Sequence, residues 1–87
     1  MQDLNERVLA SLEKVRSDIR ERLNVSDFVS EGVLDSLDIM NVIMTLEDDF
    51  SIEIDPEEVI TDNFASLNSI AKMVSEHLSG GNDRWKI

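Results

Sequence analysis

Apolar residues recur at helical spacing in separate segments of this chain, and this periodicity constrains the fold more than any other feature. Between Leu4 and Ile19 they fall three or four positions apart, with charged residues between them. Such spacing places the apolar side chains on one face of a helix. The apolar positions of this first expected helix are Leu4, Val8, Leu12, Val15 and Ile19. The pattern predicts an all-α domain.

The same spacing returns near the end of the chain. Ser66 is expected to cap a last helix, and Gly80 with Gly81 to end it. The expected buried face consists of Leu67, Ile70, Ala71, Val74 and Leu78. The pattern therefore indicates a helix that packs on the same core.

Two segments between the helices have a different character. Asn24 to Leu34 mixes apolar residues with short polar ones, which favours a long ordered loop with its apolar side chains packed under the helices. Ser51 to Asp55 alternates apolar and polar residues like a strand. No second strand is indicated nearby, so we expect an extended connector.

A short third helix is predicted after that connector. Asp55 can act as its cap, Pro56 suits its first position, and Glu58 lies three residues after the cap. With a helix over Ser36 to Phe50, the chain is expected to form a four-helix bundle.

Size and composition exclude several classes of protein. The 87 residues suffice for one domain, expected over residues 1–79, and residues 80–87 with Trp85 are expected to be a frayed tail. The chain has no cysteine and a single histidine, His77, which we expect near a helix end at the surface. No metal site and no catalytic residue is therefore predicted. The chain has no apolar run long enough to span a membrane and no signal-peptide pattern, so we expect a cytoplasmic monomer without membrane insertion.

The helix expected over Ser36 to Phe50 carries more apolar residues than one buried face requires. One face gathers Ile39, Val42, Ile43, Leu46 and Phe50. A second strip, rotated from the first, holds Leu37, Met40 and Met44. This strip is either additional core or an exposed surface for partner proteins, to which flexible methionine side chains adapt well.

Negative charge is concentrated in the middle of the chain. The formal net charge is −11, and the stretch from Ser26 to Asp62 contains twelve acids and no lysine or arginine. Such a field repels nucleic acid and anionic lipid but attracts proteins with basic patches. We therefore expect no nucleic-acid partner, and the acids serve either solubility or docking.

Ser36 stands where these features meet. Asp35 can accept hydrogen bonds from the first amides of the helix, and Asp38 adds a carboxylate to the first turn. Ser36 is then at the first helical position, where backbone amides favour a phosphate. Serine at a helix start is usually a cap, but Asp35 can take that role and leave Ser36 free. No base is placed to activate the hydroxyl, since His77 belongs to the last helix.

Asp35, Ser36 and Leu37, followed by Asp38 and closing in the sequence LEDDF, closely resemble the attachment motif of acyl carrier proteins. The resemblance covers roughly Leu4 to Leu78. It implies a carrier without enzymatic activity, with a four-helix bundle of the acyl carrier protein type. It also implies that a phosphopantetheinyl transferase attaches 4'-phosphopantetheine from coenzyme A to Ser36, and that the arm holds an acyl or aminoacyl group as a thioester.

The resemblance further implies where partners and cargo bind. The matching positions for partner docking are Asp35, Leu37, Asp38, Met40, Met44, Glu47 and Asp48. Val59 and Phe64 are expected at a groove that shelters the cargo. The partners implied are an acyl- or aminoacyl-activating ligase and downstream synthases or transferases with basic patches.

The cargo itself is left open by the sequence. Leucine precedes Asp35, as in carriers that serve adenylating ligases, and Asn41 stands where carriers of fatty acid synthesis commonly have glutamate. Fatty acid, polyketide and nonribosomal peptide pathways are all compatible with the motif. Two other classes of protein are alternatives. One is an unmodified acidic adaptor that binds proteins through the Leu37, Met40 and Met44 strip, and the other is a calcium sensor, for which the required loop pattern is absent.

Overall fold

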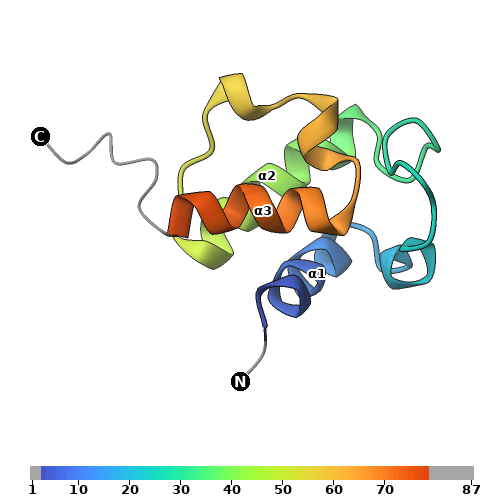
Figure 1. Ribbon diagram of the computed structural model, residues 1–87, viewed down its shortest axis with the longest axis horizontal. Coiled ribbons are helices and arrows are strands. Elements are labelled where there is room, and N and C mark those ends of the chain that lie inside the picture. The colour runs from blue at the N-terminus through green and yellow to red at the C-terminus, as the bar shows by residue number, and fades with distance from the viewer. Residues whose placement is uncertain (1–2, 79–87) are drawn as a thin grey trace, which may run out of the picture.

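The computed structural model describes residues 3–78 and is built of helices and turns. Its α-helices are α1 (Leu4–Val15), α2 (Ser36–Phe50) and α3 (Leu67–Leu78) (Figure 1). Three 3₁₀ turns lie in the connections: η1 (Ile19–Arg22), η2 (Pro56–Glu58) and η3 (Thr61–Phe64). No strand occurs within residues 3–78. The all-α prediction is confirmed.

Helix α1 is shorter than predicted. It begins after Asp3, whose carboxylate accepts the backbone N–H of Glu6 at 2.9 Å, and it ends at Val15 because Arg16 is extended, with φ −129°. Ile19 belongs to η1 instead, yet its side chain is fully buried. The periodicity could not distinguish the two arrangements, because a turn that follows a short break returns Ile19 to the same core.

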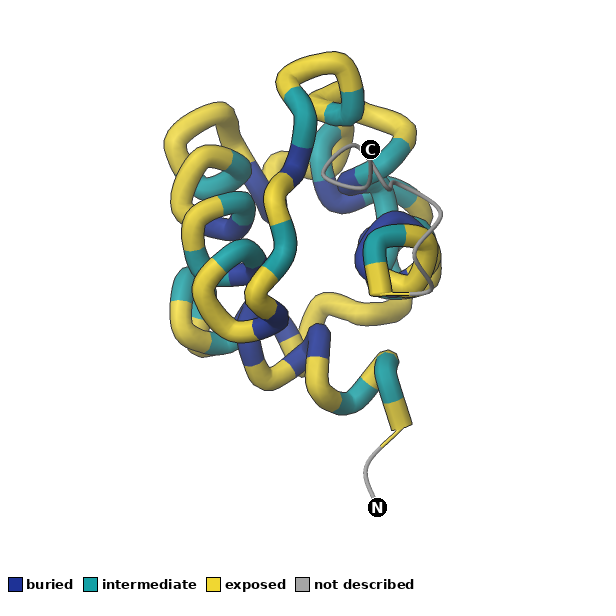
Figure 2. The backbone as a smooth tube through the Cα atoms, turned by 90° about the vertical axis from the view of Figure 1, so that its left-hand side faces the viewer, coloured by how far each residue is buried: buried dark blue, intermediate teal, exposed yellow. Residues whose placement is uncertain are grey.

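The helices pack around a single apolar core. Helix α1 contacts both α2 and α3. Figure 2 shows buried positions on the inner side of each coil and exposed positions on its outer side. The core also receives side chains from the connector between α1 and α2, where Phe28, Val33 and Leu34 are buried. This connector runs along one end of the molecule, and α2 starts at that same end (Figure 1).

The segment from α2 to α3 departs from the prediction of a short third helix. Ser51 ends α2 in the left-handed conformation with φ 55°, and residues 52–55 then form neither helix nor strand, in agreement with the expected connector. The two 3₁₀ turns η2 and η3 then occupy the place of the short helix. An extended residue, Ile60 with φ −124°, separates them, so the backbone cannot continue as one α-helix. The start signal at Asp55 is used nonetheless, since the Glu58 carboxylate accepts the backbone N–H of Asp55 at 3.0 Å.

Several sequence predictions fall outside residues 3–78. These are the domain limit at residue 79, the glycine stop at Gly80 and Gly81, and the tail of residues 80–87 with Trp85. Within the described part of the chain, none of the helices has the length and apolar character needed to cross a membrane.

Candidate functional site

Two aspartates fix the first turn of α2 by hydrogen-bonding each other's backbone. The Asp38 N–H donates to the Asp35 carboxylate at 2.8 Å, and the Asp35 N–H donates to Asp38 Oδ2 at 3.2 Å. This reciprocal arrangement satisfies amides that a helix start otherwise leaves unpaired. The predicted cap is confirmed, and it is supplied without the side chain of Ser36.

Ser36 is the first residue of α2 and is exposed. Because Asp35 provides the cap, the Ser36 hydroxyl is not needed to cap the helix. Among the residues that the structure describes, none forms a hydrogen bond with this hydroxyl. Ser36 lies at the amino end of α2, and the amino end of a helix carries partial positive charge. The arrangement presents a hydroxyl to an incoming group at a position that favours an anion.

The histidine of the last helix is held by a contact with η2. His77, on α3, has a side chain that is only 6% exposed, and its Nε2 lies 2.9 Å from the Glu58 carboxylate of η2. The sequence prediction of a surface histidine is therefore wrong for this side chain, because the turn at η2 folds over the end of α3. His77 ties these two elements together and is not part of the Ser36 site.

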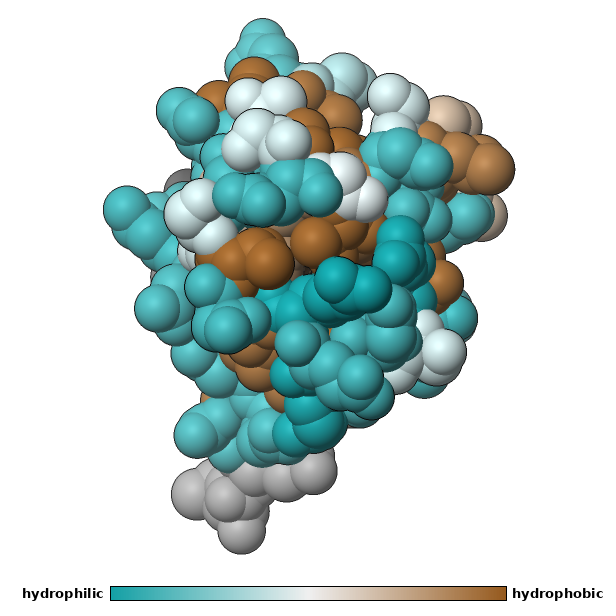
Figure 3. Space-filling view, turned by 90° about the vertical axis from the view of Figure 1, so that its right-hand side faces the viewer, coloured by the Kyte–Doolittle hydropathy of each residue, from teal (hydrophilic) through white to brown (hydrophobic). Residues whose placement is uncertain are grey.

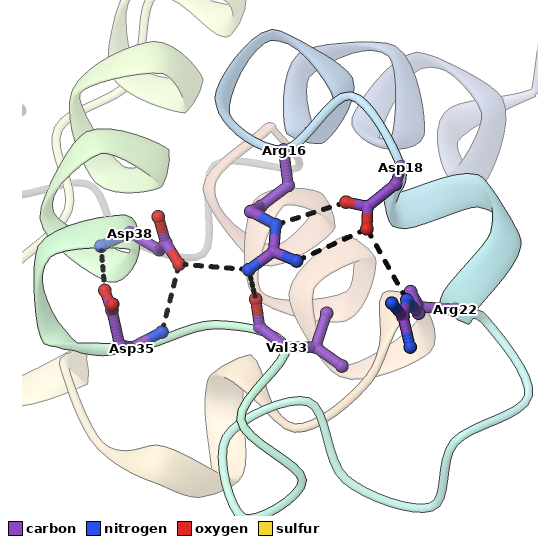
Figure 4. Close-up of polar contacts among 6 residues, drawn as sticks. All are labelled: Arg16, Asp18, Arg22, Val33, Asp35 and Asp38. Atoms are coloured by element: carbon purple, nitrogen blue, oxygen red, sulfur yellow. Dashed lines mark hydrogen bonds and ion pairs between the residues drawn. The ribbon is translucent and has the colours of Figure 1, made fainter.

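Arg16 also belongs to this site, although the sequence shows it only as one of the basic residues near the amino terminus. Its Nη1 donates to the Val33 carbonyl at 2.9 Å and lies 3.7 Å from Asp38 Oδ2, while Nε and Nη2 donate to the Asp18 carboxylate at 3.2 and 3.3 Å (Figure 4). The hydrogen bond with Asp18 raises the pKa of Arg16 and lowers the pKa of Asp18. Arg16 is 17 positions from Val33 in the chain, so no local spacing could reveal the contact.

The second apolar strip of α2 is exposed. Leu37, Met40 and Met44 have exposed fractions of 66%, 60% and 64%. The interpretation of the strip as additional core is therefore wrong, and the condition for a docking surface is met. On the other face, Val42, Leu46 and Phe50 are buried, and Ile39 and Ile43 pack against them.

Hydrophobic groups also reach the surface at the end of the molecule that carries the α1–α2 connector. Figure 3 shows them in the middle of this face, with hydrophilic side chains around them. Farther along α2, a shallow depression beside Met44 is lined by Lys14, Glu47, Asp48 and Asp49. The surface around α2 thus alternates apolar and charged groups.

The predicted docking acids differ in whether their carboxylates form hydrogen bonds or ion pairs within the fold. Asp48 is exposed at the surface of α2. Glu47 accepts the backbone N–H of Ile54 at 2.9 Å, and Asp38 is held by Asp35 and Arg16. Glu47 therefore has a structural role that the sequence did not reveal, and Asp38 combines its place in the first turn of α2 with a contact to Arg16.

The two predicted groove residues lie at different depths. Val59 is 42% exposed and is followed by Ile60, which is 53% exposed. Phe64 is fully buried and belongs to the core. Within residues 3–78, the carboxylates and His77 form no group of three or more that could hold a metal ion.

Comparison with known proteins gives a consistent picture. Residues 7–74 match the family described as "Phosphopantetheine attachment site". The chain is 30% identical over 77 residues to the acyl carrier protein of Helicobacter pylori (strain J99), a match covering 79% of this chain and 96% of that protein. The acyl carrier protein of Helicobacter acinonychis (strain Sheeba) matches with the same identity and coverage. No solved structure matches significantly.

Proposed function

Because the chain belongs to the acyl carrier protein family, we propose that Ser36 is the residue to which its arm is attached. Members of this family are carriers and not catalysts, and the prosthetic group is a covalently attached 4'-phosphopantetheine. One observation carries the assignment: the Asp35–Asp38 cap leaves Ser36 exposed at the first position of α2, with its hydroxyl unused.

The local chemistry fits a phosphodiester at this position. An exposed hydroxyl leaves room for the group, and the partial positive charge of the helix start favours a phosphate next to it. In the transfer, the Ser36 oxygen bonds to the pantetheine phosphate, the pyrophosphate bond of coenzyme A breaks, and adenosine bisphosphate leaves. The serine proton needs a base. His77 is held by Glu58, so the transferase supplies the base together with its metal ion.

The exposed strip of α2 is the surface we assign to docking. Leu37, Met40 and Met44 supply apolar contacts that suit several partners in turn. The acids Asp35, Asp38, Glu47 and Asp48 add negative charge around the strip. The partners that fit are the phosphopantetheinyl transferase and biosynthetic enzymes whose docking faces are basic and apolar.

The cargo is an acyl or aminoacyl group held as a thioester on the thiol of the arm. A tether keeps the group at high effective concentration near each partner site. The leucine before Asp35 favours loading by an activating ligase, and Val59 and Phe64 remain the residues proposed for a groove. Because Phe64 is buried in the core, a groove there requires η3 to move away from the helices. The cytoplasmic location, the monomeric state and the domain limits remain predictions.

Intact mass tests the attachment site. Incubation with a purified phosphopantetheinyl transferase, magnesium and coenzyme A is expected to add the mass of one phosphopantetheine to the wild-type protein. Ser36→Ala should gain nothing and keep its helical circular dichroism. Ser30→Ala is the matched control, since Ser30 is an exposed serine in the preceding connector. Addition to Ser36→Ala would overturn the site, and no addition to any variant would return the protein to the class of unmodified adaptors.

A further inference from the structure

Arg16 joins the two ends of the connector between α1 and α2. It is the first residue after α1, and its Nη1 donates to the carbonyl of Val33, near the other end, at 2.9 Å. The same nitrogen lies 3.7 Å from Asp38 Oδ2. Figure 4 shows the guanidinium between the end of α1 and the first turn of α2. One side chain therefore spans from α1 to the residues on both sides of Ser36.

The Asp38 carboxylate links Arg16 to the start of α2. Its Oδ2 atom is shared between Arg16 and the backbone N–H of Asp35, which lies at 3.2 Å. Asp35 in turn accepts the N–H of Asp38 at 2.8 Å. A continuous chain of polar contacts thus runs from Arg16 to the backbone directly before Ser36.

The guanidinium is itself held in place. Asp18 accepts from two of its nitrogens at 3.2 and 3.3 Å, and Arg22 lies 3.5 Å from Asp18. A planar fork of donors can satisfy three acceptors at once, which the single ammonium group of lysine does not match. With Asp18 on one edge, the opposite edge of Arg16 is directed at Val33 and Asp38.

We propose that Arg16 is a positioning residue for transfer of the arm to Ser36, acting as a latch that keeps the first turn of α2 closed. The proposal rests on the proposed function of Ser36. The first turn of a helix is where hydrogen bonds are lost most readily, and the orientation of Ser36 depends on that turn. A transferase needs the hydroxyl at a fixed place, since a displacement of about 1 Å can cost on the order of a hundredfold in rate.

If Arg16 acted only through its charge, its removal would favour the reaction with the transferase instead of slowing it. The guanidinium partly neutralises the acids at the start of α2, so its removal makes this surface more negative and favours association with a basic partner. Loss of the latch instead lowers the rate of the transfer step. The electrostatic effect therefore lowers KM, whereas loss of the latch lowers kcat.

The test compares Arg16→Gln with Arg20→Gln in the transferase assay. Arg20 pairs with Glu6 and Glu13 and has no contact with residues 33–38 among its described partners, so its removal changes the net charge equally without touching the latch. Arg16→Gln is expected to lower kcat about tenfold to a hundredfold, with KM unchanged or lower. Arg16→Lys should recover part of this loss, and Arg20→Gln should behave like the wild type. Amide hydrogen exchange at Asp38 should accelerate in Arg16→Gln alone.

Three outcomes overturn the latch: wild-type kcat in Arg16→Gln, an equal loss in Arg20→Gln, or a loss that the unfolded fraction seen by circular dichroism fully accounts for. Failure of the proposed function looks different. In that case the wild-type protein itself accepts no arm, and the role of Arg16 in transfer falls with it.

Discussion

The Asp49 carboxylate on α2 accepts a hydrogen bond from the Ser11 hydroxyl on α1 at 2.6 Å. Ser11 is buried, and Lys14 on the same helix places its Nζ 2.9 Å from both carboxylate oxygens. The hydrogen bond from Lys14, followed by that from Ser11, lowers the pKa of Asp49 below its ordinary value of 3.8. A single acid of α2 therefore fastens that helix to α1, in a region where the sequence shows only an acidic surface.

Neutralising Asp49 should destabilise the fold. Asp49→Asn removes the ion pair with Lys14 and weakens the bond to the buried Ser11, so we expect a loss of about 1 to 2 kcal/mol in the free energy of unfolding, toward the low end because Lys14 is exposed to solvent. Chemical denaturation at neutral pH measures it. Asp48→Asn is the matched control, since Asp48 is the exposed neighbour. An equal loss in both variants would show that net charge, and not this contact, matters.

The same contact predicts a pH dependence with a definite sign. The pKa of Asp49 is lower in the folded than in the unfolded chain, so folding favours the ionised form. Its contribution is fully present above 3.8 and is lost as the pH falls through the lowered folded value. Between neutral pH and that acidic range, the stability difference between the wild type and Asp49→Asn should shrink. A difference independent of pH would contradict an ionised Asp49 in the folded protein.

Local signals in the sequence predicted the helix cap and the exposed Ser36, but they did not predict contacts between distant residues. Asp35, Ser36 and Asp38 are within one helical turn, so the cap and the exposed hydroxyl follow from their spacing. The contacts of Arg16 with Val33 and of Ser11 with Asp49 join residues 17 and 38 positions apart. Nothing in the local pattern marks such pairs, because the fold alone brings them together.

The periodicity of apolar residues predicted which side chains share a helix face, but it did not predict which faces the neighbouring elements cover. It grouped Leu37, Met40 and Met44 into one strip, but only the packing of the neighbouring elements leaves that strip exposed. It also extended the first helix to Ile19, whose burial in a separate 3₁₀ turn satisfies the same spacing. The faces of the helices were thus predictable from the sequence, while their ends were not.

Reversal of the charge at Asp48 should slow partner association without affecting the fold. Asp48 is exposed, so Asp48→Lys removes attraction for a basic partner at little cost in stability. The association rate with the transferase, measured by stopped flow, should fall in this variant. It should also fall for the wild type as salt rises to physiological strength, where exposed charges are screened over about 8 to 10 Å. Rates indifferent to both changes would limit the acids to solubility.

Asp38 provides the contrast, because its carboxylate also serves the helix start. Asp38→Lys loses the bonds to the Asp35 N–H and to Arg16, so it should cost about 0.5 to 2 kcal/mol of stability in addition to slowing association. Denaturation followed by circular dichroism measures this cost beside that of Asp48→Lys. Equal stability of the two reversals would mean that the Asp38 contacts contribute little to folding.

Truncation of Met44 and of Leu46 should separate docking from packing within α2. Leu46 is fully buried, whereas Met44 is 64% exposed, although both removals take away a similar apolar volume. Leu46→Ala leaves a cavity and should cost about 2 to 5 kcal/mol, a large part of the stability of a small domain, while Met44→Ala should cost about 1 kcal/mol or less. The functional effects should be reversed: Met44→Ala should raise KM for arm attachment in a folded protein, and Leu46→Ala should lower activity only through unfolding. If Met44→Ala is modified as efficiently as the wild type, the exposed strip does not contact the transferase, and docking must rest on the acids and on the surroundings of Ser36.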